Sequence, residues 1–479
     1  MLDLDVQTSG QVKREARADV AVPLVAGAAG TAAMVAGIST PSMWNDELAT
    51  YSAITRSLGG LWQLAQNIDA HFLPYYTVMH FWAKLGDDLW WLRLPTALAV
   101  GVTAGLLADL GRRLGSRAAG IWAAVVFVLL PFTSYHGQNA RPYAFAALAA
   151  VLSFWALHRA IDGTGRRPWV TYTLTVLFLG CTHLMAVLVL PAHLLVAWRS
   201  KRRWLIHAGI GLVPWAGLVV LGTLQSQAVS WIERPDWKTF TGLPGALTGS
   251  TALALLLIGA AVIGSGTPLK PWRSGLWVWL LLPPLLLFAV SWVAMPLYVD
   301  RYFFAAAPAL ALLAGLALAQ VRPPAAVALL LVGGIVALPD LTLNRAQDGR
   351  REDYPFVIDT IERAYRPGDV VIYGQAPQRE GVLYYRRSAE GFPADVLRRG
   401  ASRVPGTFGF AERGDLNHVL SQATRVWTIW RGNPARGVED LGRVAPAKLR
   451  SLTVLGFEPV QTWEPDRSPG LMLVLFIRK

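Results

Sequence analysis

Long apolar stretches, separated by short polar and basic connections, dominate the first 340 residues of the chain. A helix needs about 20 apolar residues to cross the hydrocarbon core of a bilayer, and most of these stretches approach that length. The pattern therefore predicts a polytopic α-helical membrane domain over residues 20–339. The eleven predicted spans are 20–38, 92–110, 118–134, 142–158, 169–182, 184–198, 204–222, 249–265, 276–294, 302–319 and 325–339.

Composition agrees with this class of protein. Hydrophobic residues make up 53% of the 479-residue chain and charged residues 16%, with a mean hydropathy of +0.38, whereas soluble domains average about 25% charged residues. The single cysteine, Cys181, lies in an apolar stretch, which excludes a disulfide framework and a cysteine-based metal site. The net charge of +13 would suit a nucleic-acid partner, but the cations cluster in short connections between spans, which argues against one.

The distribution of these cations predicts the orientation in the membrane. Alternate connections carry clusters, such as residues 112–117 and 199–203, whereas the others carry scattered single cations. Clusters of Lys and Arg stay on the cytoplasmic side. We therefore predict a cytoplasmic tail over residues 1–19 and an outer-face position for residues 39–91 and 340–479. Arginine greatly outnumbers lysine, and alanine and glycine are abundant, which favours a bacterial multi-pass protein of the plasma membrane.

The first outer loop, residues 39–91, has its own apolar pattern. Leucine, tyrosine and tryptophan recur at roughly helical spacing over residues 48–65. Residues 72–85 are apolar but too short to cross the bilayer, and they contain Pro74. Both stretches predict juxtamembrane helices that lie along the membrane surface.

Beyond residue 340 the pattern changes to that of a small α/β domain. Charged residues become frequent and no apolar run is long enough to span. We predict helices at 355–364 and 446–455, and strands at 369–373, 381–385, 425–430 and 470–477. The segment shows no glycine-rich phosphate loop, metal-ligand cluster or nucleophile motif, so acceptor binding and scaffolding both stay open as its role.

An acidic pair, Asp46–Glu47, lies eight residues beyond the end of the first predicted span. Two carboxylates at the outer membrane surface are suited to act as a base or as a cation site. The alternative is structural, because Asn45–Asp46–Glu47 also has the composition that opens a surface helix.

Five short motifs follow one another in the first part of the chain. They are WNDE at 44–47, HFLPYY at 71–76, LRLP at 92–95, RRLGSRAAG at 112–120 and GQNARPYA at 137–144. In this order they resemble the glycosyltransferase family 39-like branch of the GT-C superfamily, which includes protein O-mannosyltransferases and aminoarabinose transferases. The resemblance covers roughly residues 20–200 and continues weakly at residues 300–302. Two positions depart from the family pattern: Phe72–Leu73 replaces its first proline, and Asn139 replaces a glutamate.

The resemblance implies a GT-C fold of about 11 transmembrane helices and a polyprenyl-phosphate-sugar donor. The sugar, mannose or another hexose or pentose, would pass with inversion to a hydroxyl of a lipid, glycan or protein acceptor. The phosphate leaving group is already anionic, so the site must supply a base for the acceptor and cations for the phosphate. Asp46 is our candidate base, and Glu47 would orient the acceptor or support Asp46.

Other candidate site residues fall in or near the same motifs. Arg93, Arg141 and Arg301 each begin a predicted span at the outer face, where bidentate bonds to phosphate are possible. A single arginine at such an edge is also a common snorkelling anchor. Predicted substrate-binding residues are His71, Tyr75, Tyr143 and Tyr302, with His183 equally consistent with a structural role and with Trp44 and Trp231 as candidates to stack on a sugar. We predict no protein metal ligands, and the need for a divalent cation stays open.

Two other functions are compatible with many spans. A transporter or flippase of a lipid-linked substrate would normally show internal repeats and charged residues near the membrane midplane. The chain has no visible repeat, and its span interiors are nearly free of ionisable residues. A transferase that uses a nucleotide sugar would need an acidic cluster on the cytoplasmic side, which the sequence lacks. The concentration of reactive residue types at one face favours the enzyme.

Overall fold

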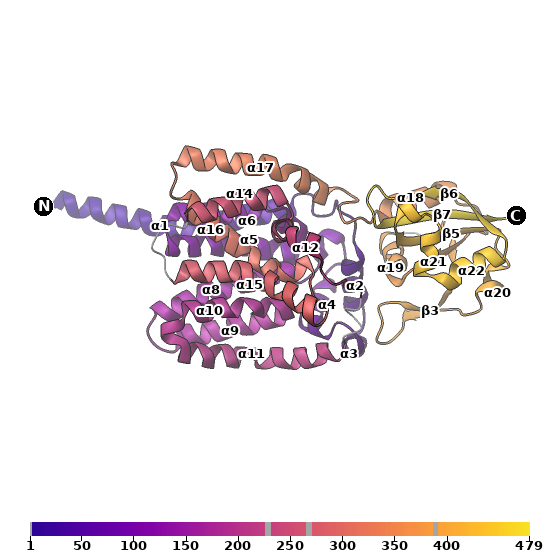
Figure 1. The fold of residues 1–479 in the computed structure, drawn as a ribbon, viewed down its shortest axis with the longest axis horizontal. Coiled ribbons are helices and arrows are strands. Elements are labelled where there is room, and N and C mark those ends of the chain that lie inside the picture. Colours follow the sequence, from indigo (N-terminus) through magenta and orange to yellow (C-terminus); the bar gives the residue numbers. More distant parts are fainter. Residues whose placement is uncertain (1, 226–230, 265–270, 387–390) are drawn as a thin grey trace. The chain divides into compact units, whose positions relative to one another are not determined.

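The structure is a computed structural model that describes residues 2–225, 231–264, 271–386 and 391–479 (Figure 1). It divides into two compact units. Unit 1 comprises residues 1–38 and 69–344, and unit 2 comprises residues 39–68 and 345–479. The first loop is therefore split: residues 39–68 fold with the C-terminal segment, whereas the sequence analysis assigned the whole of 39–91 to the membrane domain.

The described residues of unit 1 form helices joined by turns and short loops. Its longer helices are α1 (Leu2–Val35), α5 (Leu89–Leu114), α6 (Arg117–Leu129), α8 (Tyr143–Asp162), α9 (Arg167–Thr182), α11 (Lys201–Thr223), α14 (Thr251–Ile263), α15 (Trp272–Val293), α16 (Ala307–Leu318) and α17 (Pro323–Arg345). Shorter helices connect them: η1 (Ala70–Phe72), α4 (Leu73–Ala83), α7 (Pro131–Gly137), η2 (Leu184–Val189), α10 (Leu190–Val196), η3 (Trp198–Ser200), α12 (Trp237–Thr241), α13 (Leu243–Thr248) and η6 (Asp300–Ala306).

The prediction of a polytopic helical membrane protein is confirmed. Among the described residues, seven helical segments are long and apolar enough to cross a membrane, and α6 with α7 makes an eighth if that bent pair is one span. The other three predicted ranges, 169–182, 184–198 and 249–265, form shorter helices, and residue 265 lies outside the described residues. The bend of 69° between α6 and α7 occurs at Leu130, whose extended backbone is what a following proline imposes.

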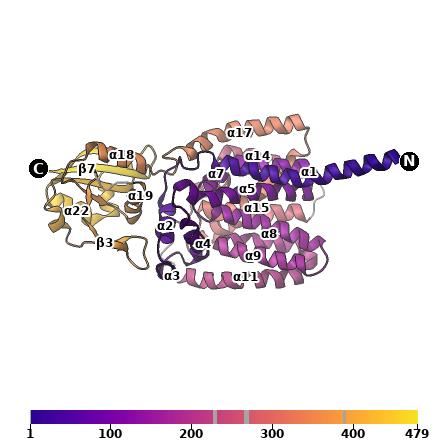
Figure 2. The same ribbon diagram turned by 180° about the vertical axis from the view of Figure 1, so that it is seen from behind.

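Small residues allow the first helices to pack closely. A Cβ atom on Gly101 of α5 would overlap Thr31 Oγ1 and lie 2.6 Å from the carbonyl oxygen of Gly27 on α1. At Gly120 of α6 it would overlap the carbonyl oxygen of Ala108. Helices in lipid associate through such close backbone approaches, because the hydrophobic effect gives no driving force there. Helices α1 and α5 accordingly run side by side in both views (Figure 2).

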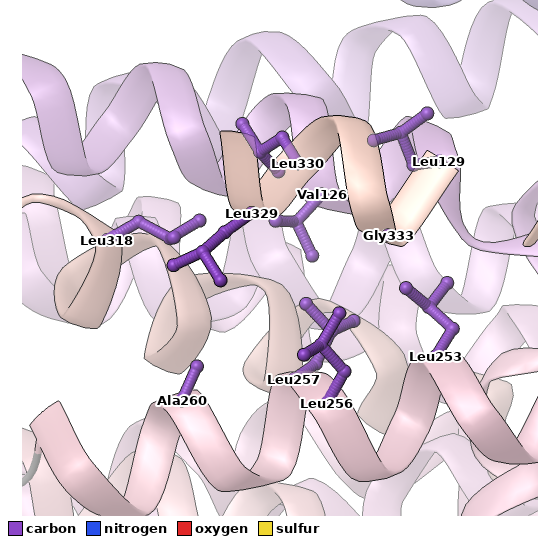
Figure 3. Close-up of a pocket in the computed structure, with 10 residues that line it drawn as sticks. All are labelled: Val126, Leu129, Leu253, Leu256, Leu257, Ala260, Leu318, Leu329, Leu330 and Gly333. Atoms are coloured by element: carbon purple, nitrogen blue, oxygen red, sulfur yellow. The ribbon is translucent and has the colours of Figure 1, made fainter. Parts of the chain in front are cut away.

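A narrow gap lies between α6, α14, α16 and α17 (Figure 3). Its volume is about 30 Å³, and the ten residues that line it are all apolar or glycine. None of the candidate site residues lines it. The gap is therefore a packing feature of the bundle with no groups suited to chemistry.

Unit 2 is an α/β domain, as predicted for the C-terminal segment. Its five-stranded sheet has the order β2-β1-β5-β7-β6, in which β1 is parallel to β2 and β5, and β7 is antiparallel to β5 and β6. The strands are β1 (Val370–Tyr373), β2 (Ala394–Asp395), β5 (Arg425–Gly432), β6 (Phe457–Trp463) and β7 (Gly470–Arg478), with β3 (Arg398–Arg403) and β4 (Phe410–Glu412) as a separate pair. The helices are α2 (Asn45–Ile54), α3 (Leu58–Asn67), α18 (Tyr354–Ala364), α19 (Ala376–Tyr385), α20 (Leu416–Leu420), α21 (Glu439–Val444) and α22 (Pro446–Val454), with the short η7 (Pro434–Arg436).

One predicted strand is wrong. Residues 381–385 form the second half of helix α19. The helix begins with a capping box in which the side chains of Gln375 and Gln378 each accept a hydrogen bond from the other's backbone amide. Gly381 then packs so closely against the ring of Tyr354 that a Cβ atom there would overlap it. The cap and this contact decide the conformation over the strand-like composition of the segment.

Candidate functional site

The candidate residues of unit 1 gather around Arg141. Arg141 lies just before α8 and is 4% exposed. Its Nη1 donates a hydrogen bond of 3.0 Å to the hydroxyl of Tyr76, which in turn donates one of 2.8 Å to Oδ2 of Asp69. The guanidinium also lies over the ring of Phe72, 4.4 Å from the ring centre. A buried cation is thus oriented by an aromatic face and by a hydroxyl that leads to a carboxylate.

Asp69 has an unusual backbone. Its φ of 57° and ψ of 30° lie in the left-handed region, which few residues other than glycine adopt. The next amide, that of Ala70, donates a hydrogen bond of 3.0 Å to Oε1 of Gln225. Strained residues of this kind concentrate at functional sites, and here the strain directs the chain into the motif that supplies His71 and Tyr76.

Arg301 is a second cation that shares a tyrosine with Arg141. Its Nε donates a hydrogen bond of 3.1 Å to the hydroxyl of Tyr143, and the ring of Tyr143 lies 5.9 Å from the Arg141 guanidinium. The rings of Trp231 and Tyr302 lie 5.2 and 5.7 Å from the Arg301 guanidinium. Five candidate residues, from the GQNARPYA motif, from residues 301–302 and from position 231, are therefore brought together in one cluster.

Two histidines complete this cluster. The ring of His183 lies 5.0 Å from that of Tyr302, 5.6 Å from that of Tyr143 and 6.1 Å from that of His71. Removal from water lowers the pKa of His71; the nearby Arg141 adds to this effect, and Asp69 opposes it. His71 is therefore neutral at pH 7 and able to donate one hydrogen bond and accept another.

Tyr75 faces an apolar cavity of about 310 Å³. The lining comes from α4, α5, α8 and α9 and includes Val78, Trp82, Leu98 and Phe145. Pro142, which follows Arg141 in the chain, also lines this cavity. The residue that follows the buried Arg141 in the chain thus forms part of the wall of this apolar cavity.

Arg93 has a different environment. It is fully buried, and its Nη1 donates a hydrogen bond of 2.8 Å to the carbonyl of Ile38, just beyond the end of α1. The side chain of Gln138 donates to the carbonyls of Met34 and Ala36 in the same stretch. Cationic and amide donors stabilise the exposed carbonyls at a helix C-terminus. Arg93 therefore has a structural role, and its contact with donor phosphate stays a prediction.

Asp46 and Glu47 lie in the first turn of α2, in unit 2. The helix that the structural alternative predicted is present, and acidic residues suit the positive end of its dipole. The cap residue, Trp44, makes no side-chain hydrogen bond to the helix. Glu47 is fully buried, unlike an ordinary surface-helix residue. The catalytic role of the pair stays a prediction.

Glu352 is a further candidate that no sequence motif predicted, and it contacts the start of α2. It is fully buried, and its Oε1 accepts a hydrogen bond of 3.4 Å from the amide of Asn45. Burial raises the pKa of Glu352 to about 7, although Arg431, the Tyr354 hydroxyl and the Asn45 amide favour the charged form. No sequence signal marks this residue, because it stands in a charged stretch and belongs to none of the family motifs.

No cluster of three or more His, Cys, Asp or Glu side chains suited to a metal ion occurs in the described part of the chain.

Part of the chain matches a family model, and its fold is similar to solved structures. Residues 72–231 match the family model of dolichyl-phosphate-mannose-protein mannosyltransferase. The structure is similar to that of ArnT from Cupriavidus metallidurans, with 14% identity over 94% of this chain and 97% of ArnT. The TM-score is 0.58 for apo ArnT and 0.60 for ArnT bound to undecaprenyl phosphate. No curated protein matches the sequence. These matches agree with the resemblance drawn from the motifs: the chain has the fold of ArnT, and its residues 72–231 match the mannosyltransferase family model.

Proposed function

We propose that this protein moves a sugar, mannose or another hexose or pentose, from a polyprenyl phosphate to an acceptor hydroxyl, with inversion. The observation that carries the proposal is the pairing of Arg141 and Arg301 through Tyr143, next to an apolar cavity of about 310 Å³. A ligand that is anionic at one end and a long hydrocarbon at the other matches both features. The comparison structure of ArnT with undecaprenyl phosphate supports the same class of donor.

The donor phosphate is assigned to the arginines. Arg141 and Arg301 would stabilise the charge that grows on the phosphate as the bond to C1 of the sugar breaks. Arg93 is a third predicted contact. His71, Tyr75, Tyr143 and Tyr302 offer the hydroxyls, ring nitrogens and ring faces that would orient the sugar, and the Trp231 indole beside Arg301 offers a flat surface for stacking.

The acceptor is assigned to the carboxylates of α2. Asp46 would take the proton of the acceptor hydroxyl as its oxygen attacks C1 from the side opposite the phosphate. The phosphate leaves as an anion and needs no general acid. Glu47 would orient the acceptor. The acceptor is a lipid, a glycan or a protein, and no step of this mechanism requires a divalent cation.

The proposal includes an orientation in the plasma membrane. The cation clusters of the connections would keep the N-terminus in the cytoplasm and the site and C-terminal domain on the outer face. A reporter fused after Lys479 that is active outside the cell would support this orientation. Activity of the same reporter in the cytoplasm would contradict it.

Asp46→Asn tests the mechanism. In reconstituted full-length protein with a radiolabelled polyprenyl-phosphate sugar, we expect transfer to fall by about 10²–10⁴-fold, the usual cost of losing a general base. Binding of the donor should persist, because the arginines are unchanged. Glu47→Gln should reduce transfer less. Asp359→Asn, at an exposed position paired with Arg363 on α18, is the matched control and should transfer normally.

Two outcomes would contradict the proposal. Near-normal transfer by Asp46→Asn would leave the acidic pair with only its role at the start of α2. A wild-type protein that moves the donor lipid between leaflets without releasing polyprenyl phosphate would be a flippase.

A further inference from the structure

The start of helix α2 is held by residues from the far end of the chain, all within unit 2. The amide of Met43 donates a hydrogen bond of 2.8 Å to the hydroxyl of Tyr385. The amide of Asn45 donates to Glu352 Oε1, and Gln378 Nε2 donates a bond of 3.3 Å to the side-chain oxygen of Asn45. The turn that presents Asp46 is thus fixed by side chains more than 300 positions later in the sequence.

Glu352 is the charged member of this set. Its Oε2 accepts a hydrogen bond of 3.1 Å from the hydroxyl of Tyr354, and Arg431 Nε from strand β5 lies 3.5 Å from Oε1. The ring of Tyr385 stacks on that of Tyr354, with 5.8 Å between ring centres. The carboxyl is fully buried, yet it is bonded at both oxygens. A carboxyl group held in this way fixes the position of the groups to which it is hydrogen-bonded.

We propose that Glu352 is a positioning residue for Asp46, which makes the C-terminal domain a working part of the transferase rather than an appendage that only binds the acceptor. Through the Asn45 amide, Glu352 fixes the first turn of α2 and the direction of the Asp46 carboxylate. The inference rests on the proposed function, because it assumes that Asp46 is the base.

The charge of Glu352 gives this role a measurable signature. The titratable groups that act on it are Arg431 on β5, Tyr354 on α18 and Asp46 on α2, and Tyr385 on α19 acts on Tyr354. Asp46 is one of the charged groups that act on the pKa of Glu352, which it raises. Since Glu352 changes its charge near neutral pH, transfer should respond to pH in that range.

The experiment measures kcat and donor KM of the full-length protein in lipid nanodiscs between about pH 5.5 and 8.5. Glu352→Gln keeps the shape and one acceptor oxygen but cannot titrate, so the step of kcat near pH 7 should disappear while donor KM stays unchanged. Glu352→Ala also loses the bond to Asn45, and its kcat should fall about tenfold, which corresponds to about 1.4 kcal/mol. Asp353→Asn is the control: Asp353 caps α18 with a bond to the Phe356 amide, which asparagine can replace, so its profile should match wild type.

Wild-type protein and Asp46→Asn are measured in the same assay to separate the two proposals. A wild type that transfers, with a wild-type pH profile in Glu352→Gln, would overturn the role of Glu352 and leave the proposed function intact. A rise in donor KM at constant kcat would also overturn it, because the effect would then lie on the donor. A wild type that transfers nothing from polyprenyl-phosphate sugars would overturn both.

Discussion

Tyr76→Phe tests the cation cluster with the smallest possible change. The hydroxyl of Tyr76 is the shared partner of two charged groups, since it accepts a bond of 3.0 Å from Arg141 and donates one of 2.8 Å to Asp69. Tyr76 is 1% exposed, so water does not readily replace the lost hydroxyl. The substitution therefore leaves the ring in place and removes the group that orients Arg141.

The size of the effect follows from these two bonds. A hydrogen bond to a charged group contributes about 1.5–3 kcal/mol. Most of the free-energy cost of removing it comes from the buried charged partner that is left without a hydrogen bond. We expect part of this loss to appear as a less well oriented Arg141, which weakens donor binding by about 2 kcal/mol, or roughly 30-fold. The value of kcat should fall as well, because Arg141 is proposed to stabilise the charge that grows on the leaving phosphate.

The assay is equilibrium binding of a fluorescent polyprenyl phosphate to the four proteins of a double-mutant cycle: wild type, Tyr76→Phe, Arg141→Lys and the double variant. If Tyr76 acts through Arg141, the two changes should be clearly less than additive. Tyr172→Phe is the matched control, because Tyr172 is equally buried in unit 1 but bonds to His193 at 2.9 Å.

Any of three results would refute this role of Tyr76. Unchanged affinity in Tyr76→Phe would show that the hydroxyl does not prepare the cation for phosphate. Full additivity with Arg141→Lys would show that the two residues act separately. An equal loss of affinity in Tyr172→Phe would attribute the effect to general destabilisation.

Three further predictions concern stability and are checked by unfolding of the full-length protein in detergent. The pKa of Glu352 is raised in the folded state from 4.5 to about 7, so its stabilising contribution is fully present below pH 4.5 and is lost as pH rises through 7. Relative to Glu352→Gln, the free energy of unfolding of wild type should fall by about 3 kcal/mol over that range. A constant difference between the two proteins would contradict the assignment. Arg379→Met should lower the free energy of unfolding of unit 2 by about 3 kcal/mol, because buried Arg379 pairs with Asp395 at 2.7 Å and Glu412 at 2.6 Å. The control is Arg363→Met, at an exposed ion pair, which should change the free energy of unfolding by less than about 1 kcal/mol. Gly101→Leu should force α1 and α5 apart, so the variant should not purify as a monodisperse folded protein. Gly259→Leu should purify normally, because a Cβ atom at position 259 meets nothing within 4 Å. Normal purification of Gly101→Leu would contradict the packing argument.

The helices of unit 1 could be predicted because lipid leaves few alternatives. A long apolar run in a bilayer must satisfy its backbone internally, and for a single segment the helix is the solution. Each of the eleven predicted ranges overlaps a helix for this reason. Their ends were harder to predict. Proline at position 131 divides one range into α6 and α7, and residues 184–196 begin as a 3₁₀ helix.

Unit 2 was less predictable from the sequence because its segments are short. Residues 381–385 have a strand-like composition, and only the cap at Gln375 and the contact of Gly381 with Tyr354 make them helical. Strand β6 lacks the apolar alternation of a typical strand, with five exposed residues between Phe457 and Trp463. In such segments tertiary contacts override local preference.

The candidate site shows the same division between motif and contact. Arg141, Tyr143 and His71 lie in family motifs, and Arg301 lies at a weaker match, so the sequence named them. The partners that orient them are set by the fold: Asp69 reaches Arg141 through Tyr76, and Glu352 meets Asn45 after more than 300 intervening residues. No spacing in the sequence encodes either contact.

Asp69 lies at the boundary between the two units in the sequence. Residues 39–68, which carry the proposed base, fold with unit 2, and at Asp69 the chain returns to unit 1. Asp69 adopts a left-handed backbone at this point, which aspartate and asparagine tolerate better than most residues. Its carboxylate at the same time receives the Tyr76 hydroxyl. Glycine would satisfy only the backbone and glutamate only the charge. Aspartate satisfies both requirements, so one residue ends the segment of the proposed base and begins the support of Arg141.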